Sequence, residues 1–478
     1  MPLLFTRSPL ILGTEILLKP NIEPSAAKEK VIMNFVVIGG DAAGMSAASR
    51  AKRNQPDMEV TVLEQTDDVS YSACGMPYNI AEANRDMDDL VVRHARVFRE
   101  KQGIDLRTGH CVEAIDPAAK IVKGRASNDD DFQVPYDKLL IATGASPIVP
   151  HLPGFYQEGV LGLKTLEDGR KIREFIVDHH VKKVVIIGMG YIALEMCEAL
   201  RSRDMEVELI KPRPVFLPWM NDTLSAMVKE EIERHGVNMY PGHDVERIEK
   251  VDEGLKLLCS DLELDAQMVI VAIGVTPNSQ IAEKAGLELG PHGAIAVDKT
   301  LLTSNRDIYS AGDCADAYHV VTGKKTWIPL ALRANRGGWA VADNITGKAV
   351  SLQGVAGTAV FKVFDLQVGR TGLDVKEARD AGFDPVEVAI RSRTRAHAHP
   401  GSSTMGVQMI GDKKSGLLLG VQMVGREGVA HRINAPALAL HAKMTVEMFS
   451  QSDLAYAPPF GPVWDPMLTA ANQLMKKM

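Results

Sequence analysis

Two stretches of the sequence share one pattern: an apolar strand, a glycine-containing turn, a helix and a further strand. Residues 34–53 read NFVVIGGDAAGMSAASRAKR and are followed by EVTVLEQ, and residues 182–212 read KKVVIIGMGYIALEMCEALRSRDMEVELIKP. A strand that turns through glycines into a helix presents the unpaired N–H groups and the positive dipole end of that helix to a pyrophosphate. Two such units predict an α/β chain with two Rossmann-like domains, each binding one dinucleotide.

The first turn departs from the G-x-G-x-x-G pattern at one position. Gly39, Gly40 and Gly44 let the backbone approach a pyrophosphate, but Asp41 occupies the place of the middle glycine. The turn alone is equally compatible with a tight connection between a strand and a helix. Glu64 ends the next strand, 25 residues after Gly39, where a carboxylate can accept both hydroxyls of an adenosine ribose. The turn and Glu64 together favour a nucleotide site.

The second turn matches the pattern fully, with Gly188, Gly190 and Ala193. At the position of the ribose-binding acid it has Lys211, followed by Arg213. A cation there attracts the 2′-phosphate of NADP, whereas the carboxylate that selects NAD is missing. The alternative is that both are solvated loop charges. The pattern favours NADPH over NADH.

Composition excludes several other classes of function. The chain has 478 residues, enough for two or three domains, and it carries a net charge of −7 without a broad cationic face, so we expect no nucleic-acid partner. No apolar run is long enough for a membrane span. Five scattered cysteines without a C-x-x-C pair predict neither a disulfide framework nor a metal site, and they indicate a reducing, cytoplasmic compartment.

The order of the apolar strands predicts the domain organisation. Strands in YDKLLIATGASP (136–147), AQMVIVAIGVTPN (266–278) and RDIYSAGDCAD (306–316) are interpreted as returns of the chain to the first domain. Beyond residue 350, alternating strands and helices predict an α+β domain, with YAPPFGPVWDP an irregular segment near its end. The predicted ranges are a disordered extension or misplaced start at 1–32, an FAD domain at 33–150 and 271–350, an NAD(P) domain at 151–270 and a dimerisation domain at 351–478.

Cys74 lies in VSYSACGMPYNI, only ten residues after Glu64. A dithiol centre of the C-x-x-x-x-C type would need a second cysteine at Val69 or Asn79, so a redox-active Cys74 works alone. CGMPY also resembles a helix start, with Pro77 in the first turn, and a thiol at a helix N-terminus is stabilised as thiolate. The alternative is a buried, inert cysteine.

From residue 34 onwards, these motifs resemble the flavin-dependent pyridine nucleotide disulfide oxidoreductases, in particular their single-cysteine branch. GGDAAGMSAASRAKR, SYSACGMPYNI, IATGASP, GMGYIALE, IYSAGDCAD, VGRTGL and AYAPPF occur in the family's order. The resemblance implies FAD on the first unit, NAD(P)H on the second with Glu195 near the nicotinamide, Asp313 on the linker of the flavin nucleotide, and a homodimer. The implied cofactor-binding set is Gly39, Gly40, Ala43, Gly44, Glu64, Thr143, Gly144, Gly188, Gly190, Ala193, Glu195, Lys211, Arg213, Gly274, Gly312 and Asp313.

The branch contains coenzyme A disulfide reductases, sulfur or persulfide reductases, and NADH oxidases. Its peroxidases carry a histidine in the first turn, where this sequence has Ala42, which favours the thiol-exchanging members. The resemblance places coenzyme A contacts at Ser46, Arg50, Arg53 and Ser70. Arg50 and Arg53 share one helix face and can grip phosphates, although a solvated basic helix end is the alternative.

Two further residues are implied at the catalytic centre. Tyr456 in AYAPPF matches a tyrosine that reaches the active site across the dimer and orients substrate or protonates the leaving thiolate. The family's second tyrosine is replaced in RAHAHPG, where His399 is either a proton donor or an ordinary strand histidine. The rhodanese domain that is fused to some relatives is not expected.

The sequence therefore predicts a homodimeric NAD(P)H-dependent flavoprotein that reduces coenzyme A disulfide, coenzyme A persulfide or polysulfide through Cys74. An NAD(P)H oxidase that reduces oxygen is one alternative. An electron-transfer flavoprotein subunit, in which Cys74 is only structural, is the other.

Overall fold

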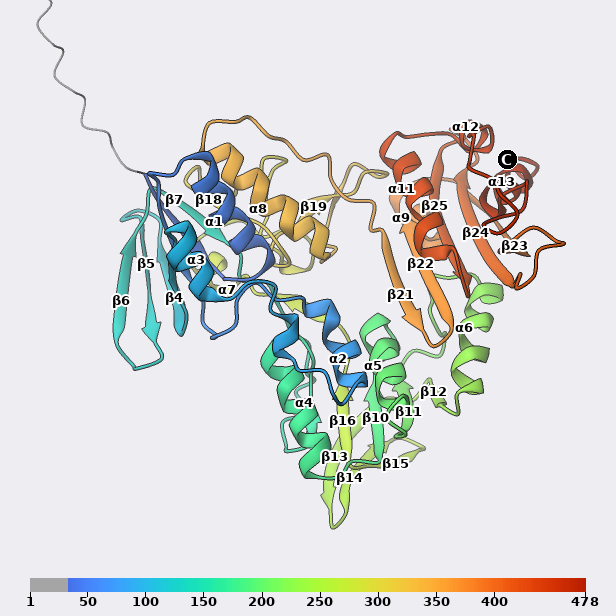
Figure 1. The fold of residues 1–478 in the computed structure, drawn as a ribbon, viewed down its shortest axis with the longest axis horizontal. Helices are drawn as coiled ribbons and strands as arrows, with labels where there is room; N and C mark the ends of the chain where they lie inside the picture. Colours follow the sequence, from blue (N-terminus) through green and yellow to red (C-terminus); the bar gives the residue numbers. More distant parts are fainter. Residues whose placement is uncertain (1–32) are drawn as a thin grey trace, which may run out of the picture. The chain divides into compact units, whose positions relative to one another are not determined.

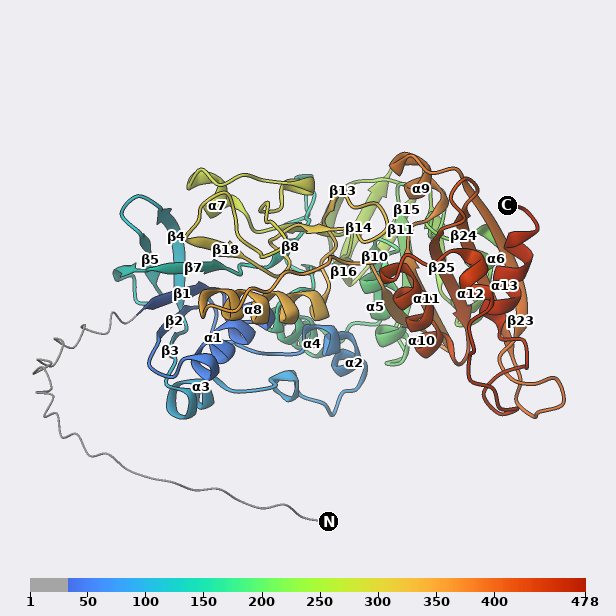
Figure 2. The ribbon, with the colours of Figure 1, turned by 90° about the horizontal axis from the view of Figure 1, so that it is seen from above.

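The first nucleotide-binding unit is a five-stranded parallel sheet. The computed structural model describes residues 33–478 (Figure 1), and the strand order is β18-β7-β1-β2-β3 (Figure 2). Ile38, which ends β1, lies beside Leu63 of β2 and Ile141 of β7, so three carboxyl ends meet at one edge of the sheet. A doubly wound sheet binds its ligand at such an edge. The strands are β1 (Asn34–Ile38), β2 (Glu59–Leu63), β3 (Asp105–Arg107), β7 (Lys138–Ile141) and β18 (Ile308–Ser310).

Two helices pack side by side against this sheet, α1 (Ala42–Asn54) and α8 (Ala331–Ile345) (Figure 2). Gly338 of α8 lies so close to α1 that a Cβ added to it would be 2.2 Å from the carbonyl oxygen of Ala43, and Ala47 and Ala340 are buried in the core formed by Phe35 and other residues of the sheet. Small side chains let helices approach closely. The N-terminus of α1 is thereby held at the carboxyl ends of the strands.

The second unit is another parallel sheet, with the order β12-β11-β10-β16-β9. We predicted that the strand in residues 266–278 returns to the first domain, and this was wrong: β16 pairs with β10, Val184 lying beside Met268. A fully apolar strand fits the interior of either sheet, so its pattern does not distinguish them. The strands are β9 (Val160–Leu161), β10 (Lys183–Ile187), β11 (Glu206–Lys211), β12 (Asn238–Pro241) and β16 (Met268–Val271).

The segment that carries Cys74 connects the two units. Helix α2 (Met76–Ala81) has Pro77 in its first turn, as predicted, and packs against α4 (Leu166–Asp178) and α5 (Tyr191–Arg201). Met76 and Ile80 are buried in the core of the second unit. The helix that follows Cys74 is therefore anchored in the second unit by apolar packing. The segment that precedes Cys74 is the loop that follows β2 of the first unit.

Smaller elements complete the two units. The return of the chain towards the first sheet begins at β17 (Val275–Pro277), which pairs with β8 (Ala145–Pro147). The others are the sheets β4 (His110–Asp116), β5 (Ile121–Ala126), β6 (Asp131–Pro135) and β13 (Val245–Val251), β14 (Gly254–Cys259), β15 (Glu263–Ala266), the pair β19 (Ala317–Tyr318) and β20 (Lys325–Thr326), and helices α3 (Ala95–Gln102), α6 (Asp222–Arg234) and α7 (Gln280–Lys284).

The C-terminal part is an antiparallel sheet with helices packed on it, which confirms the predicted α+β arrangement. The strands alternate in direction in the order β21-β22-β25-β24-β23, and the core contains Met405, Val407 and Met423. The elements are β21 (Ala359–Val363), β22 (Leu366–Gly372), α9 (Val375–Ala381), β23 (Pro385–Arg393), β24 (Thr404–Asp412), β25 (Leu418–Gly425), α10 (Val429–Arg432), α11 (Asn434–His441), α12 (Val446–Ser450) and α13 (Pro466–Met475).

The extension predicted at residues 1–32 lies outside the described residues. Within residues 33–478, none of the helices combines the length and the apolar character that crossing a membrane would require.

His319 is a buried histidine in the connection to the C-terminal sheet, and it predicts a pH dependence of stability. Burial, and then the charges of Arg370 and His441, lower its pKa to about 4. Unfolded His319 titrates near 6.5, so between these values only the unfolded chain takes up the proton, and stability falls as the pH is lowered from about 6.5 towards 4. Unfolding melts of wild type and His319→Asn should show that the variant loses less stability over this range, by up to about 3 kcal/mol. Equal losses in both proteins would contradict this account.

Candidate functional site

The turn between β1 and α1 is packed so closely that two of its positions accept only glycine. Gly39 has a φ of +106°, and a Cβ there would lie 2.2 Å from the carbonyl oxygen of Ala142. A Cβ at Gly44 would lie 1.9 Å from the carbonyl oxygen of Gly39. The first turn of α1, with Ala43, therefore lies directly on the strand ends and presents its free N–H groups there.

Glu64 follows β2 and lies against this turn. Its Oε2 accepts a hydrogen bond from the N–H of Gly40 at 2.7 Å, and its Oε1 accepts from the N–H and the hydroxyl of Thr66, both at 2.8 Å. An anion-binding helix end beside a fixed carboxylate suits the pyrophosphate and ribose of a nucleotide. A Cβ added at Gly144, after the neighbouring β7, would meet no atom within 4 Å, so there is space beside the turn. These residues fit FAD.

The chain passes between the two units beside this edge of the first sheet. Gly144 and Gly274, two of the predicted cofactor-binding residues, lie where it crosses. The Thr143 hydroxyl donates to the carbonyl of Asn278 at 2.5 Å, and the Asn278 amide donates to the carbonyl of Thr143 at 2.9 Å. The carbonyl of Gly144 accepts from the N–H of Asn278, and that of Gly274 accepts from the N–H of Ile148, both at 3.0 Å. The outgoing and returning segments are thus bonded to each other.

Asp313, which the resemblance places on the linker of the flavin nucleotide, follows β18. Its Oδ2 pairs with the Nζ of Lys164 at 2.8 Å. The half-buried Arg333 of α8 donates to the carbonyls of Gly312 at 3.2 Å and Ala315 at 3.0 Å, which fixes the turn around Asp313. Trp327 donates its indole N–H to the carbonyl of Asp313 at 2.8 Å. Asp313 is therefore held in one position by contacts from three other segments.

Cys74 lies in a single 3₁₀ turn, Ala73–Gly75, immediately before α2. Ser70, at the start of this segment, has a φ of +51°, a left-handed conformation that turns the chain sharply. The N–H of Tyr71 then donates to Oδ1 of Asp41 at 3.3 Å. Tyr78, four residues after Cys74, donates its hydroxyl to Oε1 of Glu195 on α5 at 3.0 Å. The thiol therefore lies between the first glycine turn and the helix of the second.

The predicted thiolate stabilisation by a helix end was wrong. Surrounding protein atoms, and then the carboxylate of Glu195, raise the pKa of the Cys74 thiol above its ordinary value, while Lys164 acts in the opposite direction. Helix α2 has only six residues and begins after Cys74, so its dipole is weak. Burial also raises the pKa of Glu195. Burial, followed by the charges around Cys74, therefore controls its ionisation more than a helix dipole does.

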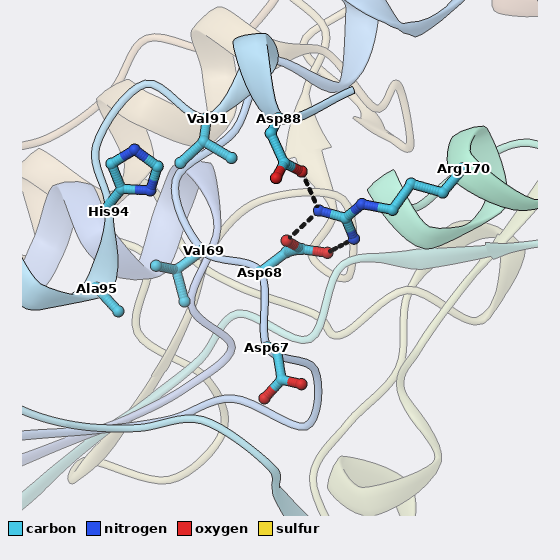
Figure 3. Close-up of a pocket in the computed structure, with 8 residues that line it drawn as sticks. All are labelled: Asp67, Asp68, Val69, Asp88, Val91, His94, Ala95 and Arg170. Atoms are coloured by element: carbon cyan, nitrogen blue, oxygen red, sulfur yellow. Dashed lines mark hydrogen bonds and ion pairs between the residues drawn. The ribbon is translucent and has the colours of Figure 1, made fainter. Parts of the chain in front are cut away.

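An ion-pair network anchors the loop that leads to Cys74 (Figure 3). Arg170 of α4 binds Asp68 through two hydrogen bonds, at 2.7 and 2.9 Å, and Asp88 through a third at 2.6 Å. A cavity of about 90 Å³ lies beside these groups, with Val69 and His94 in its wall. The network ties the loop after β2 to α4, a helix of the second unit. The loop is held at Asp68, which lies four residues before Ser72.

The second glycine turn repeats the geometry of the first. Gly188 has a φ of +127°, a Cβ there would lie 2.2 Å from the carbonyl oxygen of Ala272, and its N–H donates to the carbonyl of Ile210 at 2.8 Å. Gly190 precedes α5, and a Cβ added to it would meet no atom within 4 Å, whereas Ala193 is fully buried. An open helix N-terminus beside a close strand contact fits the pyrophosphate of NAD(P)H.

Lys211 ends β11 beside this turn. Its Nζ donates to the carbonyl of Val215 at 2.8 Å, and burial, followed by the charge of Arg213, lowers its pKa. Lys211 is half-buried and Arg213 is exposed. The two cations are therefore close together, and only Arg213 fits the description of a fully solvated loop charge.

Two of the four predicted coenzyme A contacts, Ser46 and Arg50, lie on the side of α1 that faces α8. The Ser46 hydroxyl donates to Oδ1 of Asn335 at 2.7 Å. Arg50 binds both oxygens of Asp343, at 2.9 and 2.6 Å, and lies over the ring of Trp339, 5.3 Å from its centroid. Arg53 is exposed. Because Arg50 is already paired with Asp343, Arg53 is the arginine whose side chain is more accessible to a ligand.

Tyr456 and His399 lie in two loops that contact each other in the C-terminal part. The N–H of Ala396 donates to the carbonyl of Pro458 at 3.0 Å. Arg432 pairs with Asp465 at 2.8 Å and clamps both loops through their backbone carbonyls. His399 is in the loop after β23, so the alternative of a strand histidine was wrong. In Figures 1 and 2 the elements that flank both loops lie well apart from α2 of the same subunit.

Sequence reasoning missed Lys164, Tyr78 and the electrostatic role of Asp41. Lys164 belongs to no motif, and only folding brings it to Asp313. Tyr78 had a signal, since residues four apart share a helix face, and Cys74 precedes it by four. In the sequence, Asp41 stands out only because it replaces the middle glycine of the first turn.

A histidine–carboxylate cluster elsewhere consists of Glu231, His235 and Asp365. Arg234 pairs with Glu231 at 2.6 Å, and Arg426 pairs with Asp365 at 3.0 Å. Both carboxylates are neutralised by arginines, so this cluster is an ion-pair network between α6 and the β21–β22 turn.

Comparisons with known proteins agree with this arrangement. Residues 33–338 match the pyridine nucleotide-disulphide oxidoreductase family, and residues 358–467 match the dimerisation domain of that family. The chain is 38% identical over 446 residues to an NAD(P)H sulfur oxidoreductase (CoA-dependent) of Pyrococcus abyssi, covering 93% of this chain and 99% of that protein. It is 32% identical to an NADH oxidase of Methanocaldococcus jannaschii, with 93% and 99% covered.

A solved structure extends the similarity to three dimensions. The NAD-dependent persulfide reductase from A. fulgidus superposes with a TM-score of 0.90 at 39% sequence identity, covering 93% of this chain and 83% of that chain. With two nucleotide turns, a cysteine between them and a matching C-terminal domain, the chain belongs to the pyridine nucleotide-disulphide oxidoreductases, FAD-dependent enzymes that use NAD(P)H.

Proposed function

We propose that this enzyme reduces coenzyme A disulfide, coenzyme A persulfide or polysulfide with NADPH, and that Cys74 is its only redox-active thiol. The observation that carries the proposal is the position of Cys74, which lies between the two nucleotide turns and within the electrostatic reach of Glu195, Lys164 and Asp313. The names of the relatives from Pyrococcus abyssi and A. fulgidus support this class of substrate. All five cysteines are unpaired, which supports a reducing, cytoplasmic location.

The sulfur chemistry has two steps. The Cys74 thiolate attacks one sulfur of the substrate disulfide, the substrate S–S bond breaks, and the leaving thiolate takes up a proton. The resulting mixed disulfide is then reduced by the two electrons of NADPH, which bound FAD would relay; the second thiol leaves with a proton and the Cys74 thiolate is restored. For a disulfide RSSR, the sum is NADPH + H⁺ + RSSR → NADP⁺ + 2 RSH.

Tyr456 and His399 supply the proton to the leaving thiolate from the second subunit of a homodimer. Two observations support this assignment: the match to a dimerisation domain, and large exposed apolar side chains in that part of the chain. Leu438 is 71% exposed, Phe460 77% and Trp464 63%. Surfaces of this kind mark protein interfaces. Ser46, Arg50, Arg53 and Ser70 are proposed to contact the coenzyme A moiety.

Replacing Cys74 tests the proposal directly. Wild type and Cys74→Ser are reduced with NADPH under anaerobic conditions, coenzyme A disulfide or polysulfide is added, and the flavin spectrum is followed. We expect reoxidation in wild type and a loss of at least about 100-fold in its rate in the variant, because the serine cannot form a mixed disulfide.

Each other outcome supports a different function. If both proteins stay reduced until oxygen enters, the oxidase function, favoured by the similarity to the Methanocaldococcus jannaschii NADH oxidase, replaces this proposal. If Cys74→Ser turns over like wild type, Cys74 is structural and an electron-transfer subunit is the better description.

The charges around Cys74 predict how its reactivity depends on pH. Glu195→Gln removes a negative charge that raises the thiol pKa, so alkylation of Cys74 by iodoacetamide should accelerate at pH 7. Lys164→Met removes the opposing cation and should slow the reaction at the same pH. Rates are measured on the holoenzyme by mass spectrometry of the Cys74 peptide, with the exposed Cys111 as an internal control. Shifts of the same sign in both variants would contradict this electrostatic assignment.

Lys211 and Arg213 are proposed to select NADPH. Lys211→Ala should raise the KM for NADPH about 10-fold to 100-fold, the effect of losing one charge-assisted contact, while the KM for NADH changes much less. Lys182→Ala, at the opposite end of β10, is the matched control and should change neither value. Equal effects on both nucleotides would show that Lys211 does not contact the 2′-phosphate.

A further inference from the structure

Asp41 precedes α1, yet its carboxyl group is directed away from that helix. Its side chain makes no capping hydrogen bond to α1. Instead, Oδ1 accepts a hydrogen bond from the N–H of Tyr71 at 3.3 Å, in the segment that leads to Cys74. Because Oδ1 is engaged as an acceptor, Oδ2 is the oxygen that can take up a proton.

Charged groups from three other segments act on Asp41. They are Glu64 after β2, Lys164 before α4 and Asp313 after β18. Lys164 is already paired with Asp313 at 2.8 Å, so it offsets the charge of Asp41 only in part. With Asp41 ionised, the cluster holds three negative charges and one positive charge. The phenol of Tyr71 is neutral here, because burial and the surrounding carboxylates raise its pKa.

These surroundings favour the neutral form of the acid. Burial raises the pKa of Asp41 to about 6, and the N–H of Tyr71 and Lys164 only partly oppose this effect. The nearby Glu64 and Asp313 shift it in the same direction as burial. The Asp41 carboxyl group therefore changes between its neutral and its charged form close to neutral pH.

The FAD site adds further negative charge to this cluster. The pyrophosphate binds at the N-terminal turn of α1, the helix that directly follows Asp41, and like charges make ionisation of a carboxyl group less favourable. A protonated carboxyl group is a hydrogen-bond donor, which is compatible with an anionic neighbour, whereas a carboxylate offers only acceptors.

We propose that Asp41 is a cofactor-site residue that takes up a proton when FAD binds, so that the affinity for FAD depends on pH. The proton enters at Oδ2 from solvent and leaves again when FAD dissociates. The charge of Asp41 also acts on the Cys74 thiol, but the coupling to FAD binding does not depend on which substrate the enzyme reduces.

The coupling has a defined size. If only the protonated form binds FAD, the Kd for FAD rises about tenfold for each pH unit above the pKa of the free protein. Between pH 6 and pH 8 the expected increase is thus about tenfold to 100-fold. A substitution that keeps the shape and removes the charge should abolish it.

The test is reconstitution of deflavinated protein with FAD at pH 6, 7 and 8, followed by flavin fluorescence. Calorimetry at pH 7 in buffers of different ionisation enthalpy counts the protons taken up. Wild type should show the pH-dependent Kd and take up close to one proton. Asp41→Asn should bind FAD with a nearly constant Kd, tighter than wild type at pH 8, and should take up less than half as many protons.

Two further variants keep the test decisive. Asp41→Gly restores the usual glycine and should behave like Asp41→Asn, so the proposal can be tested even if the asparagine variant does not fold. Asp67→Asn removes an exposed carboxylate from the loop after β2 and should retain the behaviour of wild type. The proposal is overturned if wild type takes up no proton, or if both Asp41 variants take up as many protons as wild type.

Discussion

The close approach of the first glycine turn to the strand ends is the constraint on which the candidate site depends. Because Gly39 and Gly44 have no side chains, the turn can pack against the carbonyls of Ala142 and of Gly39 itself. This contact brings the N-terminus of α1 to the edge where β1, β2 and β7 end. Glu64, Asp313 and the Cys74 segment are then all positioned relative to one small region of backbone.

Cys74 belongs to both units of the protein. The loop before it is bonded to the first unit through Tyr71 and Asp41, and the helix after it is buried in the second unit through Met76 and Ile80. The segment that carries the thiol is therefore held by residues of both units. Its ionisation follows first from burial and then from the carboxylates and the lysine that the two units bring together, so the short helix after it was a poor guide to its pKa.

Much of the fold could be predicted from the sequence because periodicity and glycine patterns are local. The two strand–turn–helix units, the single cysteine, the proline in the first turn of α2 and the alternating strands after residue 350 all depend on neighbouring residues. The strand at Met268–Val271 was assigned to the wrong sheet because four consecutive buried residues fit either one. Pairing between strands far apart in the sequence decides such cases.

The sequence by itself determined the class of fold, the two nucleotide turns and the isolated position of Cys74, because each is written in residues that are close together along the chain. Only the tertiary structure decided which charges surround the thiol and Asp41. Lys164, Glu195 and Asp313 come from three distant segments, and their effects depend on burial and on distances of a few ångströms. Electrostatic interactions in a partly buried site depend on such distances, and no local pattern in the sequence records them.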